Sequence, residues 1–226
     1  MNPDHGRWIA NAFEELEHSP NKPEVKRVYK IFIKETLAQA RELQKEGIKF
    51  EPSGSQLLCA SHGISCGKGG NYETAQELAK DIENNKHLFY RKSDNDYEGY
   101  EDHPLFQLTN IKNIHGENMR ANDVFRAVHD INGHCLHGAW THITSYRFTP
   151  AGEQDAYLQH KVKYSKLAIP ALFTETAGTG NWVNYNEKSG EQNRFYQKSG
   201  DLDKVKFPPQ IAALFPEIYT ETDWHP

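Results

Sequence analysis

Hydrophobic positions near the start of the chain repeat with the period of an α-helix. Over residues 24–47 the apolar side chains recur about every 3.6 residues, which places them on one helix face. Pro23 stands where a first-turn proline is tolerated, and Glu24 suits the positive end of the helix dipole. Gly47 interrupts the pattern. The spacing therefore predicts one long amphipathic helix over residues 24–47.

Two shorter helical patterns follow. Thr74 opens the first, and Glu77 three residues later completes a capping-box pattern. Asn122 or Asp123 is the expected cap of the second, whose apolar residues lie at 124–131. Each pattern predicts a helix.

Residues 152–178 return to steps of three and four. Pro170 is expected to break or kink this run, unless Ser165 caps a second helix. The tail at residues 207–219 predicts one more short helix. The face expected to be shared along the run comprises Tyr157, His160, Tyr164, Leu167, Ala171 and Glu175.

Strand signals are few. Residues 51–72 are rich in Gly and Ser and are read as a loop with room for one short strand. Residues 91–120 are polar and irregular, and residues 139–151 fit a strand or an extended loop. We therefore expect a mainly α protein with few short strands, in which residues 1–226 form a single metal-binding catalytic domain.

Charge and composition narrow the setting. The chain has 26 basic and 31 acidic residues, a net charge of −5 that gives no strong nucleic-acid signal. No apolar run approaches the length that spans a bilayer, and the N-terminus lacks the regions of a secretory signal. Cys59, Cys66 and Cys135 are odd in number, which favours reduced thiols over a disulfide framework. We expect a cytoplasmic protein without a membrane partner.

Four candidate metal ligands fall within nine residues: His129, Asp130, His134 and His137. A lone histidine near a core is usually structural, whereas such a cluster favours a metal. On an ideal helix, however, His129 and His134 point roughly 140° apart. Gly133 could take a left-handed conformation, end the helix and let His134 turn back. A two-histidine site is expected on this basis, with His137 beyond the turn.

A carboxylate should complete such a site, and Glu153 and Glu175 are the candidates. On one straight helix they would stand about 33 Å apart, so both could not touch one metal ion unless the helix breaks. Glu175 lies among apolar residues, where an ionised carboxylate needs a partner. Glu153 also fits a simple role at a helix N-terminus. We therefore predict that His129, His134 and Glu175 bind the metal.

Two histidines and one carboxylate form the facial triad of non-haem Fe(II) oxygenases, which leaves positions open for O2 and substrate. A zinc hydrolase could use the same donors. The expected function is a mononuclear Fe(II)-dependent hydroxylase or monooxygenase. Its substrate would be a small molecule or a polymer-attached group.

The metal-site motif resembles that of the pterin-dependent aromatic amino acid hydroxylases. It consists of HDINGH at residues 129–134 and, forty-one residues after His134, the glutamate of FTE at residues 173–175. The resemblance implies a hydroxylase-like core, iron bound by His129, His134 and Glu175, and Asp130 near a pterin. No recognisable motif of the chain supports a pterin cosubstrate.

A longer resemblance is to an uncharacterised domain of phage and mobile-element proteins. It covers NDVFRAVHDINGH (122–134), the stretch from Gly152 to His160, and TETAGTGNWVNYN (174–186). It implies that Glu153, His160, Glu175 and Asn181 belong to one polar site. With Asp130, we therefore expect Glu153, His160 and Asn181 to act in catalysis around the metal.

Two other functions remain open. In an HD-type metal phosphohydrolase, His129 and Asp130 would bind metal with His103 or His115 and with Asp155. In a non-enzymatic binding module, the histidines and the three cysteines would hold a structural zinc ion. The six residues between Cys59 and Cys66 do not match a tight zinc knuckle.

Overall fold

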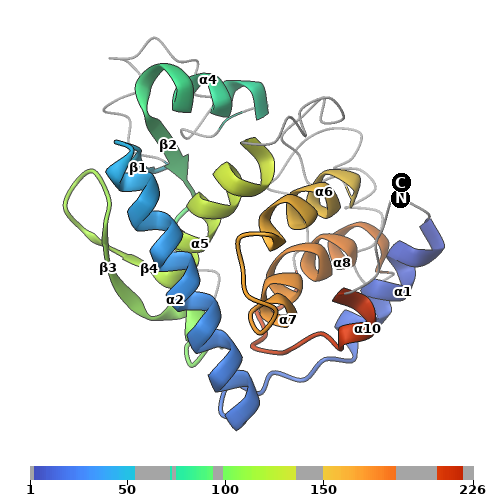
Figure 1. The fold of residues 1–226 in the computed structure, drawn as a ribbon. Coiled ribbons are helices and arrows are strands. Elements are labelled where there is room, and N and C mark those ends of the chain that lie inside the picture. The colour runs from blue at the N-terminus through green and yellow to red at the C-terminus, as the bar shows by residue number, and fades with distance from the viewer. Residues whose placement is uncertain are drawn as a thin grey trace. The chain divides into compact units, whose positions relative to one another are not determined.

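The computed structural model describes residues 3–53, 72, 75–93, 99–135, 150–186 and 208–220. This part of the chain is mainly helical with a few short strands, which confirms the expected fold class (Figure 1). None of its helices is both long and apolar enough to cross a membrane.

The chain packs as two compact units. One comprises residues 1–32 and 147–226, and the other residues 33–146. The boundary falls inside helix α2 (Pro23–Lys45), whose bounds confirm the predicted long helix. Gly47 has a φ of 91°, a left-handed conformation that glycine adopts readily just after a helix. The expectation of a single catalytic domain stays a prediction.

The first unit is built from short helices around an aromatic core. Tyr157 and Phe215 both pack edge-on against Phe173, with ring centroids 5.0 and 4.8 Å away. Besides the start of α2, its elements are α1 (Pro3–Glu14), α6 (Pro150–Lys161), α7 (Ile169–Phe173), the π-helical turn η4 (Thr174–Gly178), α8 (Thr179–Tyr185) and α10 (Glu217–Thr220).

The expected run over 152–178 is interrupted in the structure. α6 ends at Lys161, and α7 begins at Ile169 with Pro170 in its first turn. Proline is tolerated there because its missing N–H would have no helical partner. The prediction that these residues share one helix face is therefore wrong, and Leu167 is half exposed. Ala168, and not Ser165, precedes α7.

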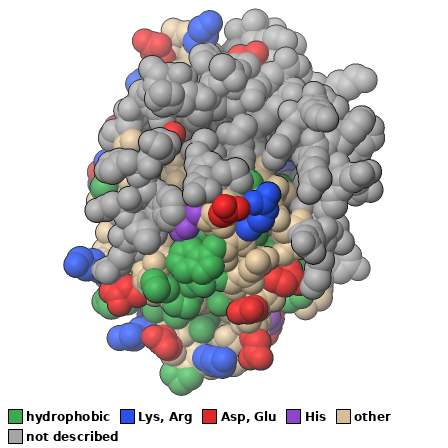
Figure 2. Space-filling view, turned by 90° about the vertical axis from the view of Figure 1, so that its right-hand side faces the viewer, with side chains coloured by type: hydrophobic (Ala, Val, Ile, Leu, Met, Phe, Trp, Pro, Cys, Tyr) green, Lys and Arg blue, Asp and Glu red, His purple; other side chains and the backbone are tan. Residues whose placement is uncertain are grey.

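Part of this unit's surface is apolar. Trp8 of α1 stacks on Tyr219 of α10 with ring centroids 4.1 Å apart, and Trp8 and Ile218 are exposed. Figure 2 views the molecule from the side where α1 and α10 lie in Figure 1. It shows hydrophobic side chains gathered beside a histidine, with acidic and basic side chains around them.

The second unit combines helices with two small sheets. β1 and β2 pair in parallel, and β3 and β4 form an antiparallel hairpin. After α2 its elements are β1 (Lys49–Pro52), α4 (Ala75–Asn85), β2 (His87–Tyr90), the 3-10 turn η1 (Pro104–Phe106), β3 (Leu108–Lys112), β4 (Asn118–Arg120), α5 (Ala121–His129) and the π-helical turn η2 (Asp130–Cys135).

The hairpin and the start of α5 differ from the sequence expectation. Residues 91–120 were expected to be irregular, yet they include β3 and β4, whose mostly polar side chains and irregular pairing give a weak strand signal. α5 begins at Ala121, just before the expected caps. Its first turn is closed by Asp123, whose carboxylate accepts the N–H groups of Arg120 and Ser93.

The remaining predicted elements are partly described. The helix expected from Thr74 is α4, while Thr74 itself lies outside the described residues. So do residues 139–149 and 54–71. Of the tail expected to be helical, residues 208–216 are not helical, and the short helix α10 covers only Glu217–Thr220.

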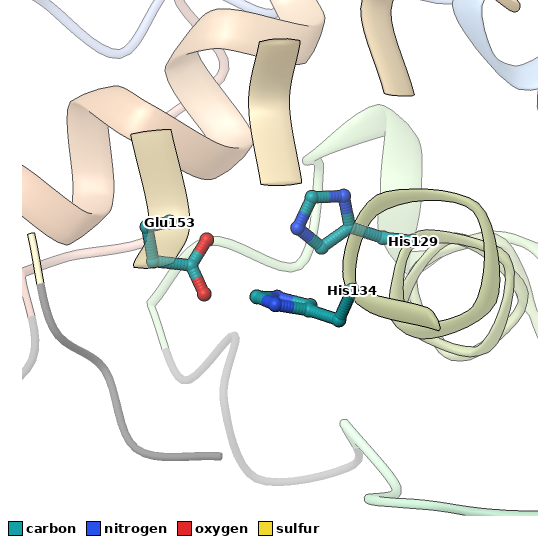
Figure 3. A group of neighbouring side chains, drawn as sticks. All are labelled: His129, His134 and Glu153. Carbon is teal, nitrogen blue, oxygen red and sulfur yellow. The ribbon is translucent and has the colours of Figure 1, made fainter. Parts of the chain in front are cut away.

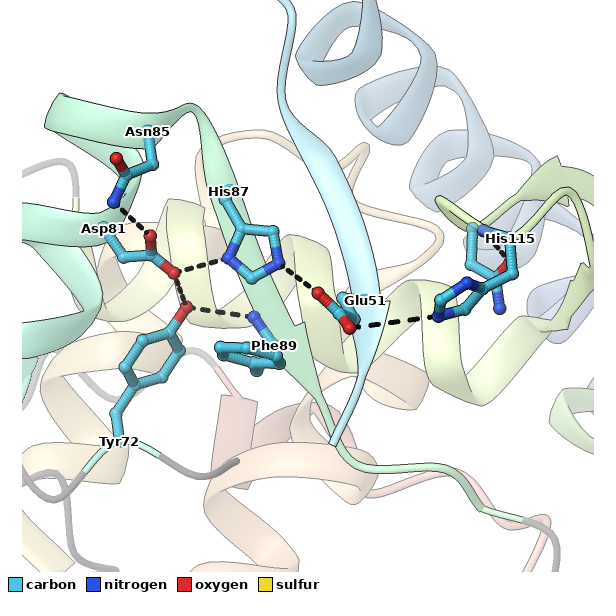
Figure 4. Close-up of polar contacts among 8 residues, drawn as sticks. Glu51, Tyr72, Asp81, Asn85, His87, Phe89 and His115 are labelled. Carbon is cyan, nitrogen blue, oxygen red and sulfur yellow. Dashed lines mark hydrogen bonds and ion pairs between the residues drawn. The ribbon is translucent and has the colours of Figure 1, made fainter. Parts of the chain in front are cut away.

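A buried chain of polar groups joins α4, β2 and β1 (Figure 4). Nδ1 of His87 lies 2.6 Å from Oδ2 of Asp81, and Nε2 lies 3.0 Å from Oε2 of Glu51. The Tyr72 hydroxyl donates to the same Asp81 oxygen and accepts the Phe89 backbone N–H. These side chains are almost completely buried.

Both ring nitrogens of His87 contact a carboxylate oxygen, but a neutral imidazole carries only one N–H group. Two ionised carboxylates only accept, so either His87 donates from both nitrogens or one carboxyl keeps a proton. Burial would raise the pKa of Asp81, but hydrogen bonds from His87, Tyr72 and Asn85 hold that pKa below its usual value. Ionised Asp81 is therefore favoured by the native state.

Replacing Asp81 with Asn should lower the free energy of unfolding near neutral pH by about 1.5–3 kcal/mol, as for hydrogen bonds to a charged group. Because the native pKa lies below the unfolded value, the stabilisation is present above the unfolded pKa. It is lost as the pH falls through the native pKa. The wild type should thus lose stability on acidification more steeply than Asp81→Asn. Thermal unfolding across acidic pH, followed by circular dichroism, measures this.

Glu83 provides the matched control because it lies on the same helix and is exposed. Glu83→Gln should leave both the stability and its pH dependence close to the wild type. Equal acid sensitivity of wild type and Asp81→Asn would contradict the role given to Asp81.

Candidate metal centre

The histidine pair is formed by a π-helical turn at the end of α5. His129 is the last residue of α5, and His134 lies in η2. In a π-helix the hydrogen bonds run from i to i+5, so residues five apart lie one turn above each other. The two rings stand at 82° with centroids 5.1 Å apart, and both residues are buried (Figure 3).

The backbone conformation predicted for Gly133 is wrong. Gly133 was expected to turn left-handed and end the helix at Asn132, but helical structure continues through Cys135. Gly133 is not among the residues with positive φ. The pair forms because the π-helical turn is wider than an α-helical one, which reduces the 140° offset of an ideal α-helix.

Packing and one hydrogen bond hold η2 in place. Ile131 and Cys135 belong to the hydrophobic core of their unit, which also contains Val128. On another side, Nδ2 of Asn132 donates to Oε1 of Gln39 in α2 at 2.8 Å. The turn is thus fixed both by apolar burial and by a polar tether.

The carboxylate that stands with the pair is that of Glu153, in the first turn of α6. His129, His134 and Glu153 each offer one ligand atom, and these atoms lie within 4.8 Å of one another. Figure 3 draws the three side chains. All three residues are buried, so the group is a candidate metal centre.

Glu175, the ligand expected from the sequence, is not in this group. It lies in η4 and is partly buried, and its Oε1 accepts a hydrogen bond from the Tyr29 hydroxyl at 2.6 Å. Tyr29 is completely buried. The structure thus gives Glu175 a defined partner and sets Glu153, expected only beside the metal, with the histidines.

The other expected site residues lie on neighbouring elements. His160 is seven residues after Glu153 on α6, which puts it on the same helix face about 10 Å further along. It is buried, with its ring edge-on to Tyr164. Nδ2 of Asn181 donates to the Ala177 carbonyl, and its buried Oδ1 has no hydrogen-bond partner in the described part of the chain.

Asp130 follows His129 and opens η2. Burial, and then the Asp130 charge, raise the pKa of the Cys135 thiol. The charge of Asp130 therefore acts on Cys135, which belongs to the hydrophobic core of the unit. It is not in the group of candidate ligands, which was searched over the described residues.

The ligands that the rival functions would need are placed elsewhere. Nδ1 of His103 accepts the Leu105 N–H at the start of η1, and His115 lies 3.9 Å from Glu51. Neither joins the candidate group, nor do Asp155 and Cys135. His137, Cys59 and Cys66 lie outside the described residues.

The sequence favoured Glu175 as the third ligand, whereas the group in the structure contains Glu153. A helix break between residues 153 and 175 was expected from the sequence. Because the helix is broken, the 33 Å separation of Glu153 and Glu175 on one straight helix no longer applies. The π-helical turns have no comparable signal, because DINGHC and TETAG carry no periodicity that separates them from an α-helix.

Comparison of the chain with family models, with curated proteins and with solved structures found no match. The geometry of the site is therefore the basis for a function.

Removing the tether of η2 should weaken metal binding. Asn132→Ala and Gln39→Ala should each reduce the affinity for Zn(II) about 10-fold, the lower end of effects from groups that orient ligands. Because the two side chains form one hydrogen bond, the double variant should lose less than the product of the two effects. Competition with a chromophoric chelator measures the affinities.

Gln44 serves as the control, since it also extends from α2 but donates to the Lys112 carbonyl. Gln44→Ala should bind Zn(II) like the wild type. Fully multiplicative losses in the Asn132 and Gln39 variants would contradict the tether.

Proposed function

We propose that His129, His134 and Glu153 bind one Fe(II) ion, and that the protein is a mononuclear non-haem iron oxygenase. Its substrate would be a small molecule or a polymer-attached group. The observation that carries the proposal is the buried group of two imidazoles and one carboxylate within 4.8 Å.

The donor set favours an open metal site. Two nitrogens and one oxygen are the ligands of the facial triad, which leaves coordination positions for O2 and substrate. Structural zinc sites are instead closed by four protein ligands, commonly with thiolates. Among the described residues the group has three members and no cysteine, which supports the open arrangement.

Within this proposal each ligand has a distinct part. The imidazoles supply neutral donors on the rigid turn η2, and Glu153 supplies the single negative charge. When bound, Fe(II) would supply redox chemistry with O2, as in other facial-triad proteins. The low exposure of the three ligands would limit access of bulk water to the reacting groups.

Neighbouring polar residues would serve the site as positioning or substrate-binding groups. Asn181 is held by the Ala177 carbonyl, so its Oδ1 is a fixed acceptor suited to an N–H or O–H group of a substrate. Glu175, which accepts a hydrogen bond from Tyr29, would lie outside the ligand set. The resemblance of HDINGH and FTE to the aromatic amino acid hydroxylases agrees with iron, but it favours Glu175 as the ligand.

The two glutamates can be separated by matched substitutions. Glu153→Gln removes the anionic donor and should lower Fe(II) affinity by more than about 100-fold, beyond the effects usual for groups outside the ligand set. Glu175→Gln should change it by about 10-fold or less. Anaerobic Fe(II) titration with metal analysis of the same samples measures both.

Asp130→Asn is a further control, and it should keep near wild-type Fe(II) content with an unchanged circular dichroism spectrum. Iron loss in Glu175→Gln with normal binding by Glu153→Gln would instead make Glu175 the ligand. Loss in Asp130→Asn alone would favour the HD-type hydrolase.

The open coordination positions can be tested directly with nitric oxide, which binds Fe(II) where O2 would. The Fe(II)-loaded protein should give the S = 3/2 electron paramagnetic resonance signal of a non-haem iron–nitrosyl complex, because three protein ligands leave room for a further one. His134→Ala should lose this signal. Iron-loaded wild type without a nitrosyl signal would contradict an oxygenase site.

A further inference from the structure

Gly180 occupies an ordinary helical position in α8. It is the second residue of the described helix Thr179–Tyr185, which directly follows the helical turn η4, and it is not among the residues with positive φ. The backbone therefore does not require glycine here, and alanine would be the better helix former. Some other constraint must account for the missing side chain.

The constraint visible in the structure is Glu153. A Cβ atom added to Gly180 would lie 3.1 Å from both Cβ and Cγ of Glu153. Such contacts are tighter than nine in ten real Cβ contacts, so the Glu153 side chain would have to shift by a few tenths of an ångström. The added Cβ of Gly180 would thus meet a candidate metal ligand.

We propose that Gly180 is a positioning residue for the metal centre: its lack of a side chain leaves the space from which Glu153 reaches the metal. The inference rests on the proposed function, because it assumes that Glu153 is a ligand. Bonds from carboxylate oxygens to a metal are about 2.0–2.2 Å long and tolerate changes of only about 0.2 Å. A shift of a few tenths of an ångström at Cγ is therefore large enough to disturb the bond.

The other tight glycines of this unit have a different role. A Cβ on Gly178 would lie 2.6 Å from Cε2 of Phe215, and one on Gly6 would collide with the Tyr185 ring. Those glycines allow close packing of aromatic rings. Gly180 allows close approach to a carboxylate-bearing side chain, so its substitution should affect metal binding more than packing.

Co(II) titration of the apoprotein tests this role, since the visible absorption of Co(II) reports its coordination. Gly180→Ala should bind Co(II) about 10- to 100-fold more weakly than the wild type, with an altered spectrum. Thr179→Ala, one residue away in α8, is the matched control: it removes the hydrogen bond from the Thr179 hydroxyl to the Thr174 carbonyl in η4. It should lower the thermal stability but keep the wild-type Co(II) affinity and spectrum.

The outcomes separate the inference from the proposed function. Wild-type affinity and spectrum in Gly180→Ala would overturn the positioning role and leave the metal site standing. Absence of Co(II) binding by the wild type would overturn the metal site itself. An equal loss in Thr179→Ala would show a general effect of helix α8 and would also overturn the positioning role.

A second pair of variants covers the case in which Gly180→Ala does not fold. Glu153→Gly removes both carbon atoms that the added Cβ would meet. Combining Gly180→Ala with Glu153→Gly should therefore restore folding if the clash with Glu153 is the cause. A combined variant that also fails to fold would overturn the inference.

Discussion

The π-helical turn at residues 130–135 is the constraint on which the proposed site depends. Two histidines five residues apart point in different directions on an α-helix, but a π-helical turn brings their side chains close together. The turn is stabilised because Ile131 and Cys135 are buried in the core and Asn132 is tethered to Gln39. The irregular backbone is thus supported on both sides, as expected where a fold holds an unusual conformation for function.

Buried polar groups occur in two clusters with different chemistry. Around His87, the carboxylates of Asp81 and Glu51 receive hydrogen bonds or ionic contacts from groups of the chain itself. That cluster is a structural network. The group of His129, His134 and Glu153 instead brings two nitrogen donors and one carboxylate to the spacing of a metal site. Its composition suits a divalent cation, which would compensate the buried carboxylate.

The sequence predicted the elements better than the site. Apolar periodicity located α2, α4 and α5, and Pro170 marked the break before α7. The hairpin β3–β4 was not predicted, because its mostly exposed and polar residues do not show a clear alternation of apolar and polar positions. The histidine pair was recognised from residue type and spacing, but for the wrong backbone reason at Gly133. Glu175 was preferred to Glu153 because local apolarity can be read from a sequence, whereas the long-range partner of Glu175, Tyr29, cannot.

The most direct test of the central claim is anomalous X-ray scattering at the iron edge from crystals of the protein loaded anaerobically with Fe(II). The account predicts one iron peak per chain, bonded to His129, His134 and Glu153, with the remaining positions held by solvent. Two metal peaks bridged by Asp130, or one peak ligated by Glu175 and not by Glu153, would contradict it.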